Sequence, residues 1–187
     1  MNSYIPTSQS ILDAHERIDD FIHKTPIMTS EAINNIADAK IYFKCENLQK
    51  VGAFKMRGAS NAVLSLDKNN LGNGVATHSS GNHAAALSLA AKQLNIPAYI
   101  VMPRTAPEIK KKAVSSYCGQ ITYCEPTQQA REITLSEIVS KTNATFIHPY
   151  DNYKIIEGQA TCAKEVFDDI QDLDFLITPV GGGGLLS

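Results

Sequence analysis

The stretch Val75-Ala76-Thr77-His78-Ser79-Ser80-Gly81-Asn82-His83-Ala84-Ala85-Ala86 contains three successive patterns. A short strand-like run is followed by a tight polar turn and then by an alanine-rich segment that strongly favours a helix. Small hydroxyl residues and a glycine at a helix N-terminus expose backbone N–H groups to an anion, and the amide of Asn82 can hydrogen-bond a phenolate or carboxylate oxygen. An ordinary helix N-cap by Ser79 or Ser80 explains the same residues, so the turn alone leaves both interpretations open.

Strand-like and helix-like runs alternate in the same way along most of the chain. We expect strands over 41–46, 74–78, 98–102, 120–124, 145–148 and 174–180. We expect helices over 56–67, 82–94, 107–117, 127–141 and 153–169, after an N-terminal helix with Ile11, Ile18 and Ile22 on one face. Short strands separated by helices of these lengths predict an α/β fold, a mostly parallel sheet with helices on both faces.

A second segment, Gly52-Ala53-Phe54-Lys55-Met56-Arg57-Gly58, places a lysine directly after a phenylalanine at the start of a predicted helix. Partial desolvation against the ring would lower the pKa of the Lys55 amine, which then can form a Schiff base with an aldehyde. Most lysines are solvated surface charges, so the segment needs support from other motifs. Two interpretations of Arg57 stay open, a residue on the surface of the helix and a residue with a function.

A third segment consists of four consecutive glycines, Gly181 to Gly184, followed by Leu185 and preceded by the apolar run Phe175 to Val180. Such a run lets the backbone approach a ligand closely and point several N–H groups at one oxyanion. The segment matches neither a Walker loop nor the dinucleotide-binding pattern of glycines. It therefore predicts a phosphate-binding loop.

The three motifs, in this order, resemble the site of fold-type II pyridoxal phosphate enzymes, and within them the serine racemase and serine/threonine dehydratase group. The resemblance extends from about Ile11 to Ser187. It also includes Lys24-Thr25-Pro26, Phe43-Lys44-Cys45-Glu46-Asn47, the run from Ile96 to Pro103, and Glu157-Gly158-Gln159-Ala160-Thr161.

The resemblance implies a role for each motif. Lys55, with Phe54 beside it, would bond covalently to pyridoxal 5′-phosphate, and Ser80 would exchange the Cα proton on the opposite face of the substrate. The other cofactor contacts would be Asn82, at the 3′ oxygen, and Gly181, Gly182, Gly183, Gly184 and Leu185, at the phosphate. The substrate contacts would be Ser79, Ser80, Asn82 and His83.

The resemblance also implies two domains, with the large one split in sequence. Residues 1–73 would begin the large domain, 74–151 would form a small mobile domain, and 152–187 would resume the large domain. Family members continue well beyond the phosphate loop, so we expect the large domain to be incomplete. The ligands of an activating Mg²⁺ would lie beyond Ser187, so no metal site is expected within this chain.

A nucleotide site is a further implication. Ser30, Lys50 and Tyr117 match positions at which eukaryotic-type serine racemases bind ATP as an activator, between two subunits. Val51 and Ala85 replace polar residues of that site, which puts ATP binding in doubt. The resemblance implies a homodimer for the full-length protein.

The composition is that of a folded globular chain. Of its 187 residues 43% are hydrophobic and 19% are charged, and its formal net charge is −2, which argues against a nucleic-acid partner. No apolar run approaches a membrane span, and the N-terminus lacks the pattern of a signal peptide. We expect a cytoplasmic protein without a membrane partner.

The sequence thus predicts a pyridoxal phosphate-dependent serine racemase that also eliminates water from serine or threonine, giving a keto acid and ammonia. One alternative is a catabolic threonine/serine dehydratase, in which Ser80 would only contribute to binding. An alternative of another class is an inactive, truncated binding domain.

Overall fold

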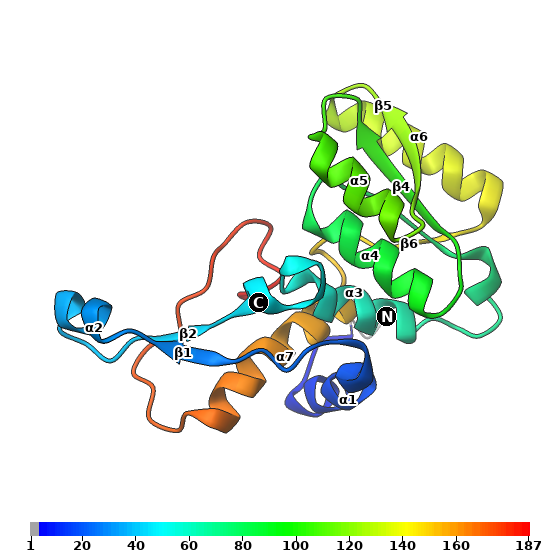
Figure 1. The fold of residues 1–187 in the computed structure, drawn as a ribbon. Coiled ribbons are helices and arrows are strands. Elements are labelled where there is room, and N and C mark those ends of the chain that lie inside the picture. Colours follow the sequence, from blue (N-terminus) through cyan, green and yellow to red (C-terminus); the bar gives the residue numbers. More distant parts are fainter. Residues whose placement is uncertain (1–3) are drawn as a thin grey trace.

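The computed structural model describes residues 4–187, and its largest sheet has four parallel strands in the order β5-β4-β3-β6 (Figure 1). These strands are β3 (Val75–His78), β4 (Ala98–Pro103), β5 (Gln120–Cys124) and β6 (Thr145–Phe146). From β3 the chain passes to β4 and β5 on one side and then returns to β6 on the other. Ligands of open α/β sheets bind at such a reversal, beyond the carboxyl ends of the strands.

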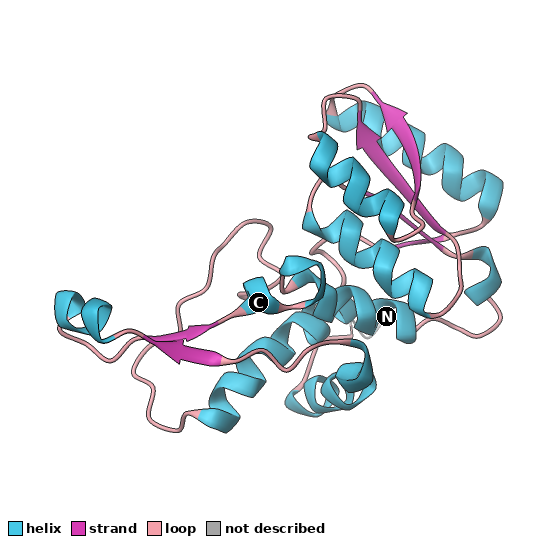
Figure 2. Ribbon diagram, viewed as in Figure 1, coloured by secondary structure: helices cyan, strands magenta, loops and turns pink. Residues whose placement is uncertain are grey.

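Helices cover both faces of this sheet, as the sequence predicted (Figure 2). The helices of the described residues are α1 (Ser8–Ile18), α2 (Glu31–Ala37), α3 (Lys55–Leu64), α4 (Asn82–Gln93), α5 (Glu108–Ser116), α6 (Gln128–Thr142) and α7 (Tyr153–Asp169). Of these, α4, α5 and α6 pack against the sheet. Alternate strand residues point to opposite faces. Ile100 therefore joins the larger core, which includes α4 and α5, while Val101 packs with Leu135 of α6 in a smaller one.

Outside this sheet, α3 packs against α7 and α1, and β1 (Ile27–Thr29) pairs antiparallel with β2 (Tyr42–Lys44) in a two-stranded ribbon. The α3–α7 contact is close because it is made at glycines. A Cβ atom on Gly158 would lie 2.6 Å from the carbonyl oxygen of Arg57 and 2.6 Å from the Cα of Gly58. Short 3₁₀ turns connect these elements at Asp19–Phe21, Glu46–Leu48, Lys50–Gly52 and Leu71–Asn73.

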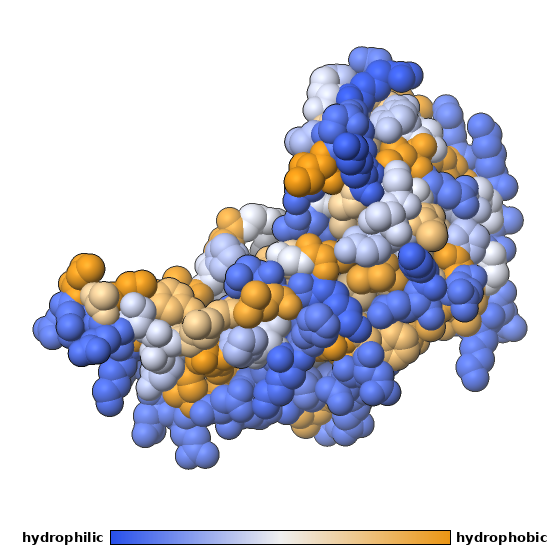
Figure 3. Space-filling model, viewed as in Figure 1, coloured by the Kyte–Doolittle hydropathy of each residue, from blue (hydrophilic) through white to orange (hydrophobic). Residues whose placement is uncertain are grey.

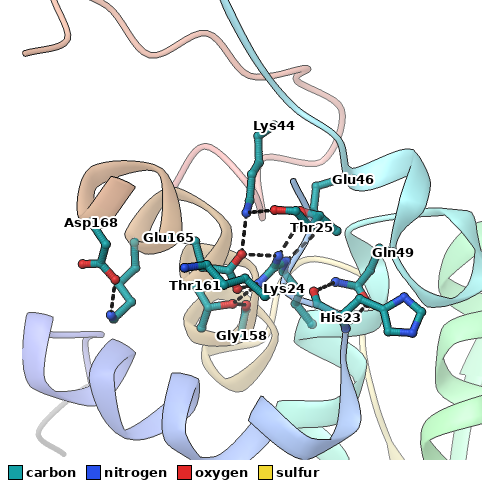
Figure 4. Close-up of polar contacts among 12 residues, drawn as sticks. His23, Lys24, Thr25, Lys44, Glu46, Gln49, Gly158, Thr161, Glu165 and Asp168 are labelled. Atoms are coloured by element: carbon teal, nitrogen blue, oxygen red, sulfur yellow. Dashed lines mark hydrogen bonds and ion pairs between the residues drawn. The ribbon is translucent and has the colours of Figure 1, made fainter. Parts of the chain in front are cut away.

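The interpretation that Arg57 lies on the helix surface is wrong. Its side chain is fully buried and forms ion pairs with Glu46 and Glu165. Figure 4 shows these two carboxylates in one cluster with Lys44 and Thr161. Lys44 donates a further hydrogen bond to Glu165 at 2.5 Å, and its positive charge balances the second carboxylate. The charge of Arg57 is thus neutralised where α3, α7 and the end of β2 meet, and this compensation permits its burial.

The strand predicted over 174–180 is also wrong: this segment has no regular secondary structure. Phe175 and Ile177 are 84% and 91% exposed. An apolar run becomes a strand only when a neighbouring strand satisfies its backbone groups, and none of the described residues lies beside it as a strand. Further apolar side chains gather at the tip of the molecule that carries α2, where Ile36 is 87% exposed (Figure 3).

The remaining elements agree with the predictions to within a few residues, apart from β1 and α2, which were not predicted. Both are short. Ser30 caps α2, accepting a hydrogen bond from the N–H of Ile33, and so starts a helix that has no strong apolar periodicity.

Candidate active site

Lys55 is the first residue of α3, and its side chain lies at the edge of a cavity of about 330 Å³. Its Nζ donates a hydrogen bond to the carbonyl oxygen of Pro149 at 2.8 Å and lies 5.2 Å from the centre of the Phe54 ring. Burial lowers the pKa of this amine, in the direction that the sequence predicted. Lys55 therefore combines a weakly solvated amine with access to an open volume.

The backbone leading to Lys55 has an unusual conformation. Val51 and Gly52 have φ angles of 58° and 70°. Glycine adopts this left-handed region freely, whereas for a β-branched residue such as Val51 it is strained, at a cost of about 1–3 kcal/mol. Strain of this kind persists only where the surrounding structure holds the backbone in place.

The glycine loop lines the same cavity as Lys55. The residues around this cavity are Phe54, Lys55, Tyr150, Pro179, Val180, Gly181, Gly182, Gly183, Gly184 and Leu185. The ring of Tyr150 lies so close to Gly182 that a Cβ atom there would be 2.3 Å from it. Within residues 4–187, the N–H groups of the four glycines donate no backbone hydrogen bond. Free N–H groups in a loop without side chains suit a phosphate group, so the loop and Lys55 fit pyridoxal 5′-phosphate.

The polar turn after β3, Ser79 to Asn82, does not line this first cavity. Ser79 and Ser80 line a second cavity of about 300 Å³, which shares Tyr150 with the first. The N-cap of α4 is Gly81, without a side-chain cap, so the simple N-cap interpretation of the serines is wrong. Asn82 accepts a hydrogen bond from Nζ of Lys110 at 2.6 Å and lines neither cavity.

His83 is buried, with its Nε2 3.4 Å from the carbonyl oxygen of Ile147. Burial is the largest cause that lowers its pKa, to about 3, and the nearby charge of Lys55 adds to the effect. His83 is therefore neutral in the folded chain near pH 7. Its Nδ1 has no partner within the described part of the chain.

Several residues of the second cavity were not singled out from the sequence. They are His78, Gln128, Arg131, His148 and Tyr150. His78 ends β3 and His148 follows β6, so both lie at the carboxyl ends of the strands where the strand order reverses. Ligands of open α/β sheets bind at this place, so the predicted strands could have pointed to both histidines. Arg131 had no signal, since one arginine in a polar helix resembles any surface charge.

The three candidate nucleotide contacts do not gather within the chain. Ser30 caps α2, Nζ of Lys50 donates to the carbonyl oxygen of Phe21 at 2.8 Å, and Tyr117 ends α5. Figure 1 places α2 at one extremity of the molecule, away from α5. The nucleotide site stays a prediction.

Two features are absent from residues 4–187. No group of three or more His, Cys, Asp and Glu side chains in this range is arranged to hold a metal ion. None of the helices in the described range has the length and apolarity needed to cross a bilayer.

Residues 18–187 match the family described as "Pyridoxal-phosphate dependent enzyme". The chain is 51% identical over 184 residues to a beta-hydroxyaspartate dehydratase of Paracoccus denitrificans, an alignment that covers 98% of this chain and 58% of the relative. It is 49% identical over 181 residues to a serine racemase of Dictyostelium discoideum, covering 97% of this chain and 56% of the relative.

A solved structure of maize serine racemase matches with a TM-score of 0.96 at 43% identity, covering 98% of this chain and 56% of that one. The chain therefore spans little more than half the length of these relatives. The resemblance drawn from the sequence is confirmed, and the chain belongs to the family of pyridoxal phosphate-dependent enzymes.

Proposed function

We propose that this chain carries the cofactor-binding lysine and phosphate loop of an enzyme that racemises serine and eliminates water from serine or threonine. The observation that carries the proposal is the pairing of Lys55, an amine of lowered pKa, with the four-glycine loop across one cavity. The similarity to serine racemases supports the choice of reaction.

Each residue has a role in this proposal. Lys55 would bond to the cofactor aldehyde, the N–H groups of Gly181–Gly184 would bind its phosphate, and Asn82, released from Lys110, would bind its 3′ oxygen. When bound, the cofactor supplies an electron sink for a carbanion at Cα of the amino acid. As a free, neutral amine no longer bonded to the aldehyde, Lys55 would take the Cα proton, because general-base catalysis needs an amine whose pKa is lowered towards the working pH. Ser80, in the neighbouring cavity, would return a proton to the other face.

The first experiment is borohydride reduction of the chain after incubation with pyridoxal phosphate, followed by peptide mass mapping. We expect one phosphopyridoxyl adduct, on Lys55, and none at that position in Lys55→Ala. A wild-type chain without a specific adduct would contradict the proposal and favour a binding domain without activity.

The second experiment measures D-serine, pyruvate and 2-oxobutyrate formed by one preparation. We expect all three products, and in Ser80→Ala we expect D-serine to disappear while the adduct on Lys55 is retained. If the wild-type protein forms only keto acids, the chain belongs to a dehydratase and Ser80 does not carry a proton. If Ser80→Ala loses the adduct, this serine has a structural role.

The second cavity favours a further candidate substrate class, amino acids with a second carboxylate. Arg131 carries a permanent positive charge at this cavity and forms no ion pair with the residues that the structure describes. Its Nε is buried without a hydrogen-bond partner among them. Burial, and next the charge of His148, lower the pKa of His78, so His78 acts as a neutral hydrogen-bonding group beside the fixed cation of Arg131. A relative named beta-hydroxyaspartate dehydratase supports this candidate.

The test compares ammonia release from 3-hydroxyaspartate and from serine in wild-type protein, Arg131→Met and the control Arg104→Met. Arg104 is exposed and pairs with Glu125, so its loss leaves the second cavity intact. Hydrogen bonds to charged groups contribute about 1.5–3 kcal/mol, so Arg131→Met should lower kcat/KM for 3-hydroxyaspartate by about 10- to 150-fold and leave serine turnover nearly unchanged. An equal loss with both substrates would reject the role of Arg131 in substrate choice.

A further inference from the structure

The segment that carries Lys55 is a loop whose two ends are joined by one ion pair. Nε and Nη2 of Arg57 donate hydrogen bonds to the two carboxylate oxygens of Glu46, both at 2.8 Å. Glu46 begins the 3₁₀ turn after β2, and Arg57 lies in the first turn of α3. A paired, two-bond contact of this kind fixes orientation as well as distance. The backbone between these residues, which includes Lys55, is therefore closed at its base.

The same loop contains the left-handed residues Val51 and Gly52. Gln49, just before them, is buried and holds the loop to the chain near His23. Its side chain accepts from the N–H of His23 at 2.8 Å and donates to the carbonyl oxygen of His23 at 2.7 Å. The unfavourable turn is thus held on one side by Gln49 and on the other by Arg57.

Arg57 has two carboxylate partners that differ in location. Glu165, on α7, accepts from Nη1 at 2.6 Å and from Nη2 at 2.9 Å, and Thr161 accepts a further bond from Nη1 at 3.2 Å. With the bonds to Glu46, these contacts use all five N–H donors of the guanidinium. Glu46 and Glu165 are similar as charges, but only Glu46 lies at the base of the loop that carries Lys55.

We propose that Glu46 and Arg57 are positioning residues for Lys55: their ion pair holds the strained loop so that the amine stays in its desolvated place at the cavity. Neither residue lines the cavity, so neither touches the reacting atoms. The proposal rests on the assignment of Lys55 as the cofactor-binding lysine. The contact of its Nζ with the carbonyl oxygen of Pro149, and the buried His83 near it, define the environment that the loop maintains.

The test compares Glu46→Gln with Glu165→Gln in the complete chain. Each variant removes one carboxylate charge from Arg57 and keeps the shape of the side chain. Glu165→Gln also removes the carboxylate that pairs with Lys44, so it should lower stability in urea at least as much as Glu46→Gln does. Competitive acetylation across a pH series, read by peptide mass spectrometry with exposed Lys40 as internal standard, reports the pKa and reactivity of Lys55 without cofactor. Borohydride trapping with pyridoxal phosphate reports how readily the amine reaches the aldehyde.

We expect Glu46→Gln to raise the pKa of Lys55 towards its ordinary value and to slow adduct formation by at least about tenfold, since a small misplacement of a reacting group has large effects on rate. Glu165→Gln should leave the pKa of Lys55 at its wild-type value. Equal changes of this pKa in the two variants, or none in either, would overturn the proposal.

Two controls keep the result decisive. If Glu46→Gln is recovered unfolded, Thr25→Val replaces it, because the Thr25 hydroxyl donates to Glu46 at 2.6 Å and its loss is milder. If the wild-type chain forms no adduct, the cofactor assignment fails, while the acetylation series still decides whether Glu46 positions the amine.

Discussion

The close contact between α3 and α7 gives a prediction that can be worked out from distances. Gly158→Ala would place a methyl group 2.6 Å from the carbonyl oxygen of Arg57, 2.6 Å from the Cα of Gly58 and 2.8 Å from the Cβ of Asn61. Two of these atoms belong to the backbone and cannot rotate away. Because ordinary contacts begin at 3.4 Å, the two helices must separate by about 0.8 Å.

The magnitude follows from two opposing effects. Alanine is a better helix former than glycine by about 1 kcal/mol, whereas overpacking costs about 1–3 kcal/mol. The separation also stretches the bonds from Arg57 on α3 to Glu165 on α7, which are 2.6 and 2.9 Å long. We therefore expect a net loss of about 1–2 kcal/mol in the free energy of unfolding, or about 2–4 °C in Tm for each kcal/mol.

The assay is urea and thermal unfolding of wild-type protein, Gly158→Ala and Gly72→Ala. Gly72 is a matched control, because a Cβ atom there would have nothing within 4 Å. We expect the control to stay within about 0.5 kcal/mol of wild type. If Gly158→Ala is as stable as wild type or more so, the helix contact is not as close as the structure has it, and the argument fails.

Three further predictions concern the site. The pKa of His83 is about 3 in the folded chain and near 6.5 in the unfolded chain, so the unfolded chain binds more protons between these pH values. Lowering the pH from 8 to 5 should therefore reduce the free energy of unfolding by about 2 kcal/mol. Acid titrations followed by circular dichroism should show this dependence in the wild-type protein and not in His83→Gln. The pKa of Lys55 is lowered, so its reductive trapping by pyridoxal phosphate should increase with pH at lower values than the trapping of free Nα-acetyl-lysine; coincident profiles would mean a solvated amine. Gly182→Ala places a Cβ atom 2.3 Å from the ring of Tyr150, whereas a Cβ atom at Gly181 has nothing within 4 Å. Gly182→Ala should therefore weaken cofactor binding by about tenfold in a fluorescence titration, and Gly181→Ala should leave it unchanged.

Local patterns predicted much of the fold. The parallel sheet follows from strand-like runs that alternate with helices, and β5 was predicted at its observed bounds, Gln120–Cys124. The position of Lys55 at the start of a helix and the approach of the glycine loop to a cavity also agree with their local motifs. Each of these features depends on residues that are neighbours in the sequence, so the sequence alone was enough to predict it.

Features that depend on distant partners could not be predicted. Arg57 is buried because Glu165 meets it from more than a hundred residues away, and no local pattern distinguishes such an arginine from a surface one. The run over 174–180 has the composition of a buried strand, yet a strand also needs a neighbour to pair with. Arg131 acquires its meaning only when α6 brings it beside the ends of β3 and β6.

The two cavities differ in the kind of atom that lines them, backbone atoms of glycines in the first and polar side chains in the second. The first is lined in part by the backbone of Gly181–Gly184, whose N–H groups do not depend on side chains at those four positions. The second is lined by side chains such as Arg131, His78 and Gln128, each of which one substitution can remove. Tyr150 lines both cavities, so the two lie side by side. If Lys55 binds the cofactor and Arg131 selects the substrate, as proposed, a substitution at Arg131 should change substrate choice while cofactor binding at Lys55 is preserved. The paired substrate assay on Arg131→Met tests this separation.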